Sequence, residues 1–133
     1  MLIHTAREVN DNKPFYVLQQ VMKFVDDFIA EKGRVPRICC LGLAFKPDID
    51  DFRESPALLI TKKLQDSYPG SVAAIEPNFL GSNLNGIPLI TSAELQVYDV
   101  VVILVKHREF YELHLRNDVK IFDYVGLYVG IKQ

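Results

Sequence analysis

Short apolar runs without polar alternation constrain the fold of this chain most strongly. One run covers residues 38–44, and shorter runs cover residues 72–75 and 100–105. A strand that is apolar at every position has to be covered on both faces, which is typical of parallel sheets with helices on each side. All of the runs are far shorter than the roughly 20 residues that cross a bilayer, so we expect no membrane span.

Helical patterns lie before and between these runs. Between residues 14 and 33, apolar side chains recur at three- and four-residue spacing, which predicts an amphipathic helix that ends at Gly33. Ser55 and Pro56 predict a second helix, with serine as the N-cap and proline in the first turn, which Pro69-Gly70 stops. The expected apolar faces are Phe15, Leu18, Val21, Met22, Val25, Phe28 and Ile29 in the first helix, and Ala57, Ile60, Leu64 and Tyr68 in the second.

The order of the elements predicts the fold class. With a short strand at residues 87–90, a short helix at 92–96, a helix from near Arg108 and a final strand at 120–122, the chain alternates strands and helices. We expect an α/β fold, a Rossmann-like doubly wound parallel sheet with helices on both faces, preceded by a long helix. Residues 1–33 are the expected connecting segment and leading helix, and residues 34–133 the α/β domain. The Asn- and Gly-rich segment 78–86 is expected to be the most flexible loop.

Charge and cysteine content exclude several classes of partner. The chain has 133 residues, with 15 basic and 17 acidic side chains and a net charge of -2, and it lacks the basic patch of a nucleic-acid binder. Its start, from Met1, lacks the pattern of a secretory signal. The two cysteines, Cys39 and Cys40, are neighbours in an apolar run and would point to opposite faces of a strand. We expect buried thiols, no disulfide, and a cytoplasmic protein.

Motifs for dinucleotides and metals are incomplete. After the first run, a dinucleotide site needs G-x-G-x-x-G, but residues 42–47 read G-L-A-F-K-P. Glu76 follows the second run, where an acid would hold a ribose, a role we do not expect without the glycine turn. His107 and His114 lack a nearby third ligand, so we expect solvent-facing histidines and no metal site.

The carboxyl ends of the strands point to Lys46. In open parallel sheets, ligands bind beyond these ends where the strand order reverses, here at residues 44–46 and 106–107. One interpretation is that Lys46 and Arg53 bind a phosphorylated ligand while the acids between them fix the loop. The other is a solvated loop in which Arg53 pairs locally with those acids. Spacing alone does not decide between them.

A family resemblance appears at this segment. Residues 41–57, L-G-L-A-F-K-P-D-I-D-D-F-R-E-S-P-A, resemble the G-x-x-F-K-x-x-x-D-D-x-R-x-S-P signature that opens the C-terminal, UDP-sugar-binding domain of the UDP-glucose/GDP-mannose dehydrogenase family. Residues 6–14, A-R-E-V-N-D-N-K-P, resemble the segment that leads into that domain. With matches around residues 75–78 and 107–110 and at the last strand, the resemblance covers nearly the whole chain.

The resemblance implies an enzymatic context. Glu76-Pro77-Asn78 and the F-K-P-x-I-D-D form of the loop are most similar to the family's bacterial UDP-N-acetylmannosamine dehydrogenases. Such enzymes oxidise the sugar C6 alcohol to a carboxylate in two NAD-dependent steps, for surface polysaccharide. The family's NAD-binding domain, catalytic lysine and asparagine, and nucleophilic cysteine match positions upstream of Met1. The resemblance therefore implies no catalytic residue in this chain, NAD bound mainly by a missing N-terminal domain, and no activity of this chain alone.

Site residues follow from the same resemblance. Lys46 matches the family lysine that contacts the nucleotide-sugar, Phe45 lines the substrate site beside it, and Arg53 matches the arginine that reaches towards NAD. Val125 stands where the family usually has a basic residue that contacts the substrate phosphates, so that contact is not implied here. The resemblance also implies a homodimer or higher homo-oligomer of the full enzyme. Alternatives are a stand-alone nucleotide-sugar-binding or oligomerisation module, and part of a UDP-glucose 6-dehydrogenase.

Overall fold

The computed structural model describes residues 13–44 and 55–125. In chain order, these form the elements α2 (Lys13–Lys32), β1 (Ile38–Leu41), α3 (Pro56–Ser67), β2 (Val72–Ile75), β3 (Asn83–Leu84) and β4 (Ile87–Pro88). The 3₁₀ helix η1 (Ser92–Val97), β5 (Val100–Ile103), the 3₁₀ helix η2 (Arg108–Glu112) and β6 (Lys120–Asp123) complete the described chain.

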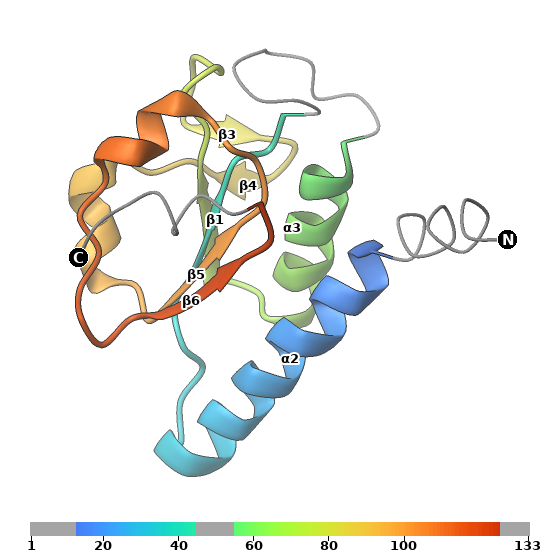
Figure 1. The fold of residues 1–133 in the computed structure, drawn as a ribbon. Helices are drawn as coiled ribbons and strands as arrows, with labels where there is room; N and C mark the ends of the chain where they lie inside the picture. Colours follow the sequence, from blue (N-terminus) through green and yellow to red (C-terminus); the bar gives the residue numbers. More distant parts are fainter. Residues whose placement is uncertain (1–12, 45–54, 126–133) are drawn as a thin grey trace, which may run out of the picture.

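A parallel four-stranded sheet with the order β2-β1-β5-β6 forms the centre of the molecule (Figure 1). Ile38 of β1 lies opposite Val72 of β2 on one side and Val100 of β5 on the other. The long helix α2 precedes the sheet and packs beside α3 (Figure 1). The predicted α/β fold, a doubly wound parallel sheet preceded by a long helix, is confirmed.

The sheet has an apolar core on each face. On one face, alternate strand residues such as Cys40 pack with the buried sides of α2 and α3. On the other, Cys39 and its alternate neighbours pack with Leu95 of η1 and Phe110 of η2. This double cover explains why the strands are apolar at every position. Both cysteines are buried, free thiols, as predicted, and burial raises the pKa of each, that of Cys40 to about 12.

Local signals placed the ends of both long helices correctly. The Ser55 Oγ accepts a hydrogen bond from the amide of Leu58 at 3.2 Å, and Pro56 begins α3. At the end of α2, Gly33 has a φ of 75° and donates to the Ile29 carbonyl at 2.8 Å. The predicted apolar face of α3 is buried as expected.

The buried face of α2 agrees with the prediction except near its start. Leu18, Val21 and Val25 are buried as predicted, but Phe15 is 65% exposed and Val17, which was not predicted, is buried. Phe15 lies three residues before Leu18 and Val17 lies four before Val21, so periodicity alone does not decide which of the two is buried. Packing against the core beside α3 and the sheet selects Val17.

Three shorter elements also differ. The helix expected from Arg108 is the 3₁₀ helix η2. Segment 78–86, expected to be a loop, contributes β3 to a hairpin whose turn residues Asn85 and Gly86 have φ values of 52° and 88°, as a type I′ turn requires. The strand expected at residues 87–90 ends at Pro88, although Leu89 makes a single bridge to Ala74 of β2.

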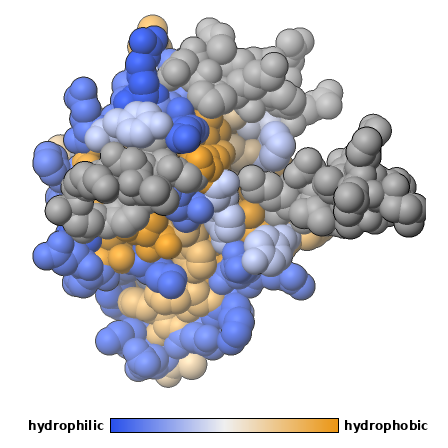
Figure 2. Space-filling view, viewed as in Figure 1, coloured by the Kyte–Doolittle hydropathy of each residue, from blue (hydrophilic) through white to orange (hydrophobic). Residues whose placement is uncertain are grey.

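The surface is mixed in polarity. Figure 2 shows apolar residues gathered where β6 crosses the molecule, with hydrophilic residues around them. β6 is the edge strand of the sheet, and three of its four residues are half-buried. Neither α2 nor α3 is long and apolar enough to span a membrane, and the other helices within residues 13–44 and 55–125 are short 3₁₀ segments.

Gly42 lets the chain leave β1 close to β5. Its φ is 96°, and a Cβ at this position would overlap the Cβ of Val105 and lie 2.9 Å from its Cγ2. Its own amide donates to the Ile75 carbonyl at 3.0 Å. The apolar run therefore continues to Ala44 in the sequence, but the strand ends at Leu41 because the backbone turns at the glycine.

We expect Gly42→Ala to destabilise the fold by about 2–5 kcal/mol, because left-handed strain and overpacking against Val105 add together. Gly33→Ala is the matched control, since Gly33 has a φ of 75° but a Cβ added to it would meet nothing within 4 Å. It should lose only the backbone contribution, about 1–2 kcal/mol. Equal losses for the two variants in urea unfolding would contradict the packing argument.

Candidate functional site

The carboxyl ends of β1, β2 and β5 meet at one edge of the sheet. β1 lies between β2 and β5, so the chain first moves to one neighbour of β1 and later returns to the other. In open α/β sheets, ligands bind outside the carboxyl ends of the strands at such a reversal. The predicted adjacency of the runs at residues 38–44 and 100–105 is confirmed by the pairing of β1 with β5. This edge is therefore the candidate site.

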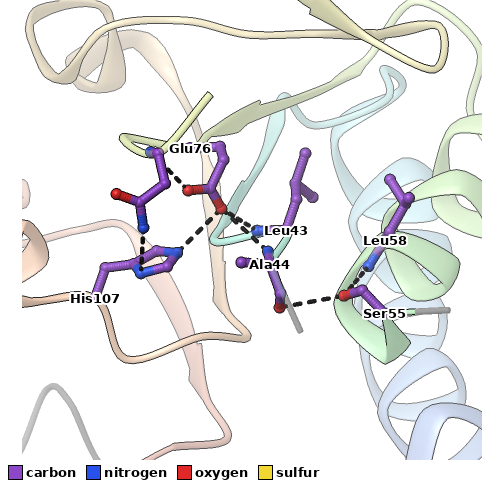
Figure 3. Close-up of polar contacts among 7 residues, drawn as sticks. Leu43, Ala44, Ser55, Leu58, Glu76 and His107 are labelled. Atoms are coloured by element: carbon purple, nitrogen blue, oxygen red, sulfur yellow. Dashed lines mark hydrogen bonds and ion pairs between the residues drawn. The ribbon is translucent and has the colours of Figure 1, made fainter. Parts of the chain in front are cut away.

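The carboxylate of Glu76 is completely buried at this edge (Figure 3). Glu76 directly follows β2, and its Oε1 accepts hydrogen bonds from the amides of Leu43 at 2.7 Å and Ala44 at 3.1 Å. Its Oε2 accepts from the amide of Asn78 at 2.9 Å. The carboxylate thus fixes the backbone that leaves β1.

His107 holds Glu76 from the side of β5. Its Nε2 lies 3.0 Å from Glu76 Oε1 (Figure 3). Its Nδ1 lies 3.3 Å from Asn78 Nδ2. An amide nitrogen donates, so Asn78 assigns the acceptor role to Nδ1 and leaves the proton on Nε2, where it is donated to Glu76. The ring of Phe110 packs edge-on against the imidazole at 5.4 Å.

The prediction of a solvent-facing His107 was therefore wrong. Its side chain is buried because the ring serves as a donor to an internal carboxylate. His114 is exposed, as expected. Within residues 13–44 and 55–125, no group of three potential ligands is placed to hold a metal ion.

Hydrogen bonds keep Glu76 ionised in spite of its burial. Burial by itself raises the pKa of the Glu76 carboxyl. The donors from His107 and from the amides of Leu43 and Asn78 act in the opposite direction and together hold the pKa below its ordinary value. The carboxylate is a fixed negative charge at the edge of the sheet.

Ser55 connects the start of α3 to the end of the β1 segment. Its Oγ donates to the carbonyl of Ala44 at 3.2 Å while it accepts from the amide of Leu58 (Figure 3). Ala44 and Ser55 are the described residues on either side of segment 45–54. These two residues are thus bonded to each other, and Glu76 holds the first of them.

The site residues predicted from the sequence lie in segment 45–54. Phe45, Lys46 and Arg53 are outside the described residues, and their roles remain predictions. Sequence reasoning missed the pair of Glu76 and His107. A signal was present, because each follows an apolar run, and the rule about carboxyl ends that pointed to Lys46 applies to them too.

We expect Glu76→Gln to lower stability at pH 7 by about 1–3 kcal/mol, because the amide cannot accept from all of the buried donors. The folded pKa of Glu76 is lowered, so its contribution is present above the unfolded pKa of about 4.3 and is lost as pH falls through the folded value. Urea unfolding of the original chain and of Glu76→Gln across this pH range should show that the difference between their free energies of unfolding becomes smaller as the pH falls. A difference that is independent of pH would contradict an ionised Glu76.

Residues 39–128 match the model of the UDP-glucose/GDP-mannose dehydrogenase family, UDP binding domain. UDP-N-acetyl-D-mannosamine dehydrogenase from Campylobacter jejuni is 47% identical over 118 residues, which are 84% of this chain and 28% of that protein. The enzyme of the same name from Escherichia coli (strain K12) is 43% identical over 82% of this chain and 28% of its own length. NDP-N-acetyl-D-galactosaminuronic acid dehydrogenase from Ralstonia nicotianae is 44% identical over 84% of this chain and 26% of its own length.

Solved structures give the same result for the fold. A UDP-N-acetyl-mannosamine dehydrogenase from Staphylococcus aureus superposes with a TM-score of 0.67 at 25% identity, over 98% of this chain and 34% of that one. GDP-mannose dehydrogenase from Pseudomonas aeruginosa has a TM-score of 0.66 at 19% identity, over 95% of this chain and 31% of that one, which shows a common fold alone. The matches to the family model and to the Campylobacter relative show that the chain belongs to the UDP-glucose/GDP-mannose dehydrogenase family, as its UDP binding domain.

Proposed function

We propose that this chain is the UDP-sugar-binding part of an NAD-dependent nucleotide-sugar 6-dehydrogenase. The observation that carries the proposal is the match of residues 39–128 to the family's UDP binding domain. The chain spans 28% of the length of the Campylobacter and Escherichia relatives, so the oxidation itself requires residues from a longer protein. The candidate edge of the sheet is the proposed place for the nucleotide.

UDP-N-acetylmannosamine is the proposed substrate, oxidised to UDP-N-acetylmannosaminuronate for surface polysaccharide. The names of the Campylobacter and Escherichia relatives, at 47% and 43% identity, support this choice. The Ralstonia relative, at 44%, favours an N-acetylgalactosamine nucleotide as the second candidate. UDP-glucose is the third sugar to compare in an assay of the longer enzyme.

The described residues do not fit NAD at the reversal in strand order. In a dinucleotide-binding domain, backbone amides after the first strand point at the pyrophosphate. Here the amides of Leu43 and Ala44 donate to Glu76 instead. This geometry supports the proposal that NAD is bound mainly by a domain outside this chain.

Three residues of segment 45–54 are proposed for ligand binding. Lys46 would supply a point charge to the nucleotide-sugar, and Phe45 would line the site beside it. Arg53 would reach towards NAD across a cleft between domains. Ala44 and Ser55, the described residues on either side of segment 45–54, both lie at the candidate edge. Their position supports the proposal that residues of this segment bind the ligand.

The remaining parts of the proposal concern the whole protein. We propose a cytoplasmic homodimer or higher homo-oligomer, with residues 1–33 as connecting segment and leading helix and residues 34–133 as the UDP-sugar-binding domain. A stand-alone binding or oligomerisation module without enzymatic activity is the alternative. Assay of a longer protein that includes this chain distinguishes the two.

The isolated chain is expected to bind UDP weakly and to form no NADH with any UDP-sugar, because the proposed cofactor domain and thiol nucleophile are absent from it. NADH absorbance and an NMR titration with UDP measure the two properties. The Campylobacter relative, 47% identical in the matched region, serves as the positive control for turnover. NADH above the no-enzyme background in a preparation free of longer enzyme would contradict the first expectation.

In the longer enzyme, Lys46→Ala is expected to impair mainly the use of the UDP-sugar, and Arg53→Ala mainly the binding of NAD. Loss of one charge-assisted phosphate contact by Lys46→Ala should cost about 1.5–3 kcal/mol in kcat/KM for the UDP-sugar. Arg53→Ala should weaken the binding of NAD far more than that of UDP-sugar. Because a surface ion pair contributes no more than ~1 kcal/mol, loss of a local pair with the neighbouring acids should change the stability of the isolated chain little. Unchanged kinetics of Lys46→Ala, or a large stability loss with normal NAD affinity in Arg53→Ala, would favour the solvated-loop interpretation.

A further inference from the structure

The amides that follow β1 face an anion that belongs to the chain itself. Leu43 and Ala44 donate to Glu76 Oε1 at 2.7 and 3.1 Å, where a dinucleotide-binding domain of this topology presents its amides to a ligand pyrophosphate. The carboxylate has no exposed surface. An internal negative charge therefore takes the place of a ligand phosphate.

Burial closes the carboxylate to a ligand. Its two oxygens accept four hydrogen bonds, three at Oε1 from the amides of Leu43 and Ala44 and from the His107 ring, and one at Oε2 from the amide of Asn78. The side chain has no exposed surface, so a ribose hydroxyl would reach it only if the surrounding residues moved apart. Glu76 therefore does not hold a ribose in the way an acid after the second strand does in dinucleotide-binding domains.

Glu76 joins three strand ends at the candidate site. It follows β2, it binds the backbone after β1, and it accepts from His107, which lies beyond β5 (Figure 3). Ala44 is held twice, through its amide by Glu76 and through its carbonyl by Ser55. The backbone at the strand ends is therefore fixed without a bound nucleotide, which lowers the ordering cost of binding.

We propose that Glu76, oriented by His107, is a positioning residue of the nucleotide-sugar site: its carboxylate substitutes for a ligand phosphate at the amides after β1 and so fixes the backbone of Leu43 and Ala44 at the edge where UDP binds. This inference rests on the proposed function, because that function makes UDP the ligand. Glu76 acts through the backbone and does not touch the nucleotide.

The test compares the affinity of the whole chain for UDP in matched carboxylate variants, by NMR titration. Glu76→Gln should bind UDP about tenfold more weakly, because the backbone after β1 is no longer held in place. A tenfold change in Kd corresponds to ~1.4 kcal/mol in the free energy of binding. Asp99→Asn is the control, because Asp99 precedes β5 at the opposite edge of the sheet and accepts from Arg34 and from the Arg37 amide. It should lose stability by the same kind of mechanism but retain its affinity for UDP.

A second pair covers the case in which Glu76→Gln does not fold. His107→Gln keeps an N–H donor for Glu76 and should bind UDP within about threefold of the original chain, whereas His107→Leu removes the donor and should lose about tenfold. Rescue by the donor-keeping variant separates positioning from packing volume.

The possible results separate the two proposals. If the unmodified chain does not bind UDP, the proposed function fails, and this inference fails with it. If it binds UDP but a folded Glu76→Gln binds equally well, the positioning role is overturned and the proposed function stands. An equal loss in Asp99→Asn, or equal affinities of His107→Gln and His107→Leu, would also overturn the positioning role.

Discussion

A carboxylate without contact to water holds together the carboxyl ends of three strands. Burial of an ion is costly unless hydrogen bonds replace its hydration. Glu76 is compensated by three backbone amides and one imidazole N–H, and these come from segments that follow β1, β2 and β5. Each segment therefore depends on the others, since loss of one donor leaves a buried charge with fewer partners.

The opposite edge of the sheet is fixed by a related but weaker arrangement. Asp99 accepts from Arg34 at 3.0 Å and from the Arg37 amide at 2.9 Å, and its side chain is 16% exposed. Burial raises the pKa of Asp99, while the donors from Arg34 and Arg37 together bring it below its ordinary value. Solvent screens the interaction of Asp99 with Arg34 more than it screens the hydrogen bonds of Glu76. The interactions at the candidate edge are therefore the stronger of the two sets.

Features with a local cause could be predicted from the sequence. Ser55, Pro56 and Gly33 set helix ends through nearby backbone groups, and the apolar runs marked the strands of the main sheet. The Asn85-Gly86 hairpin also had a local signal, but the richness of its segment in Asn and Gly was interpreted as a loop.

Features with a long-range cause could not be predicted in the same way. Glu76 and His107 are 31 positions apart, and their contact exists only after β1, β2 and β5 have assembled. The choice between Phe15 and Val17 at the start of α2 likewise depends on the position of α3. Phe45, Lys46 and Arg53 were recognised from a linear motif, and their roles stay predictions because they lie outside the described residues.

The position of β1 in the sheet has a consequence for biosynthesis. Both partners of β1 are made after it, and its second partner, β5, leaves the ribosome only after β2 and the hairpin. The helix α2 also waits for a late partner, because the Tyr124 hydroxyl that donates to the Gln20 side chain is made 104 residues after it. During translation, the nascent chain therefore carries an apolar strand with an open edge until β5 has been made, which is the type of segment that chaperones bind and that aggregates when left uncovered.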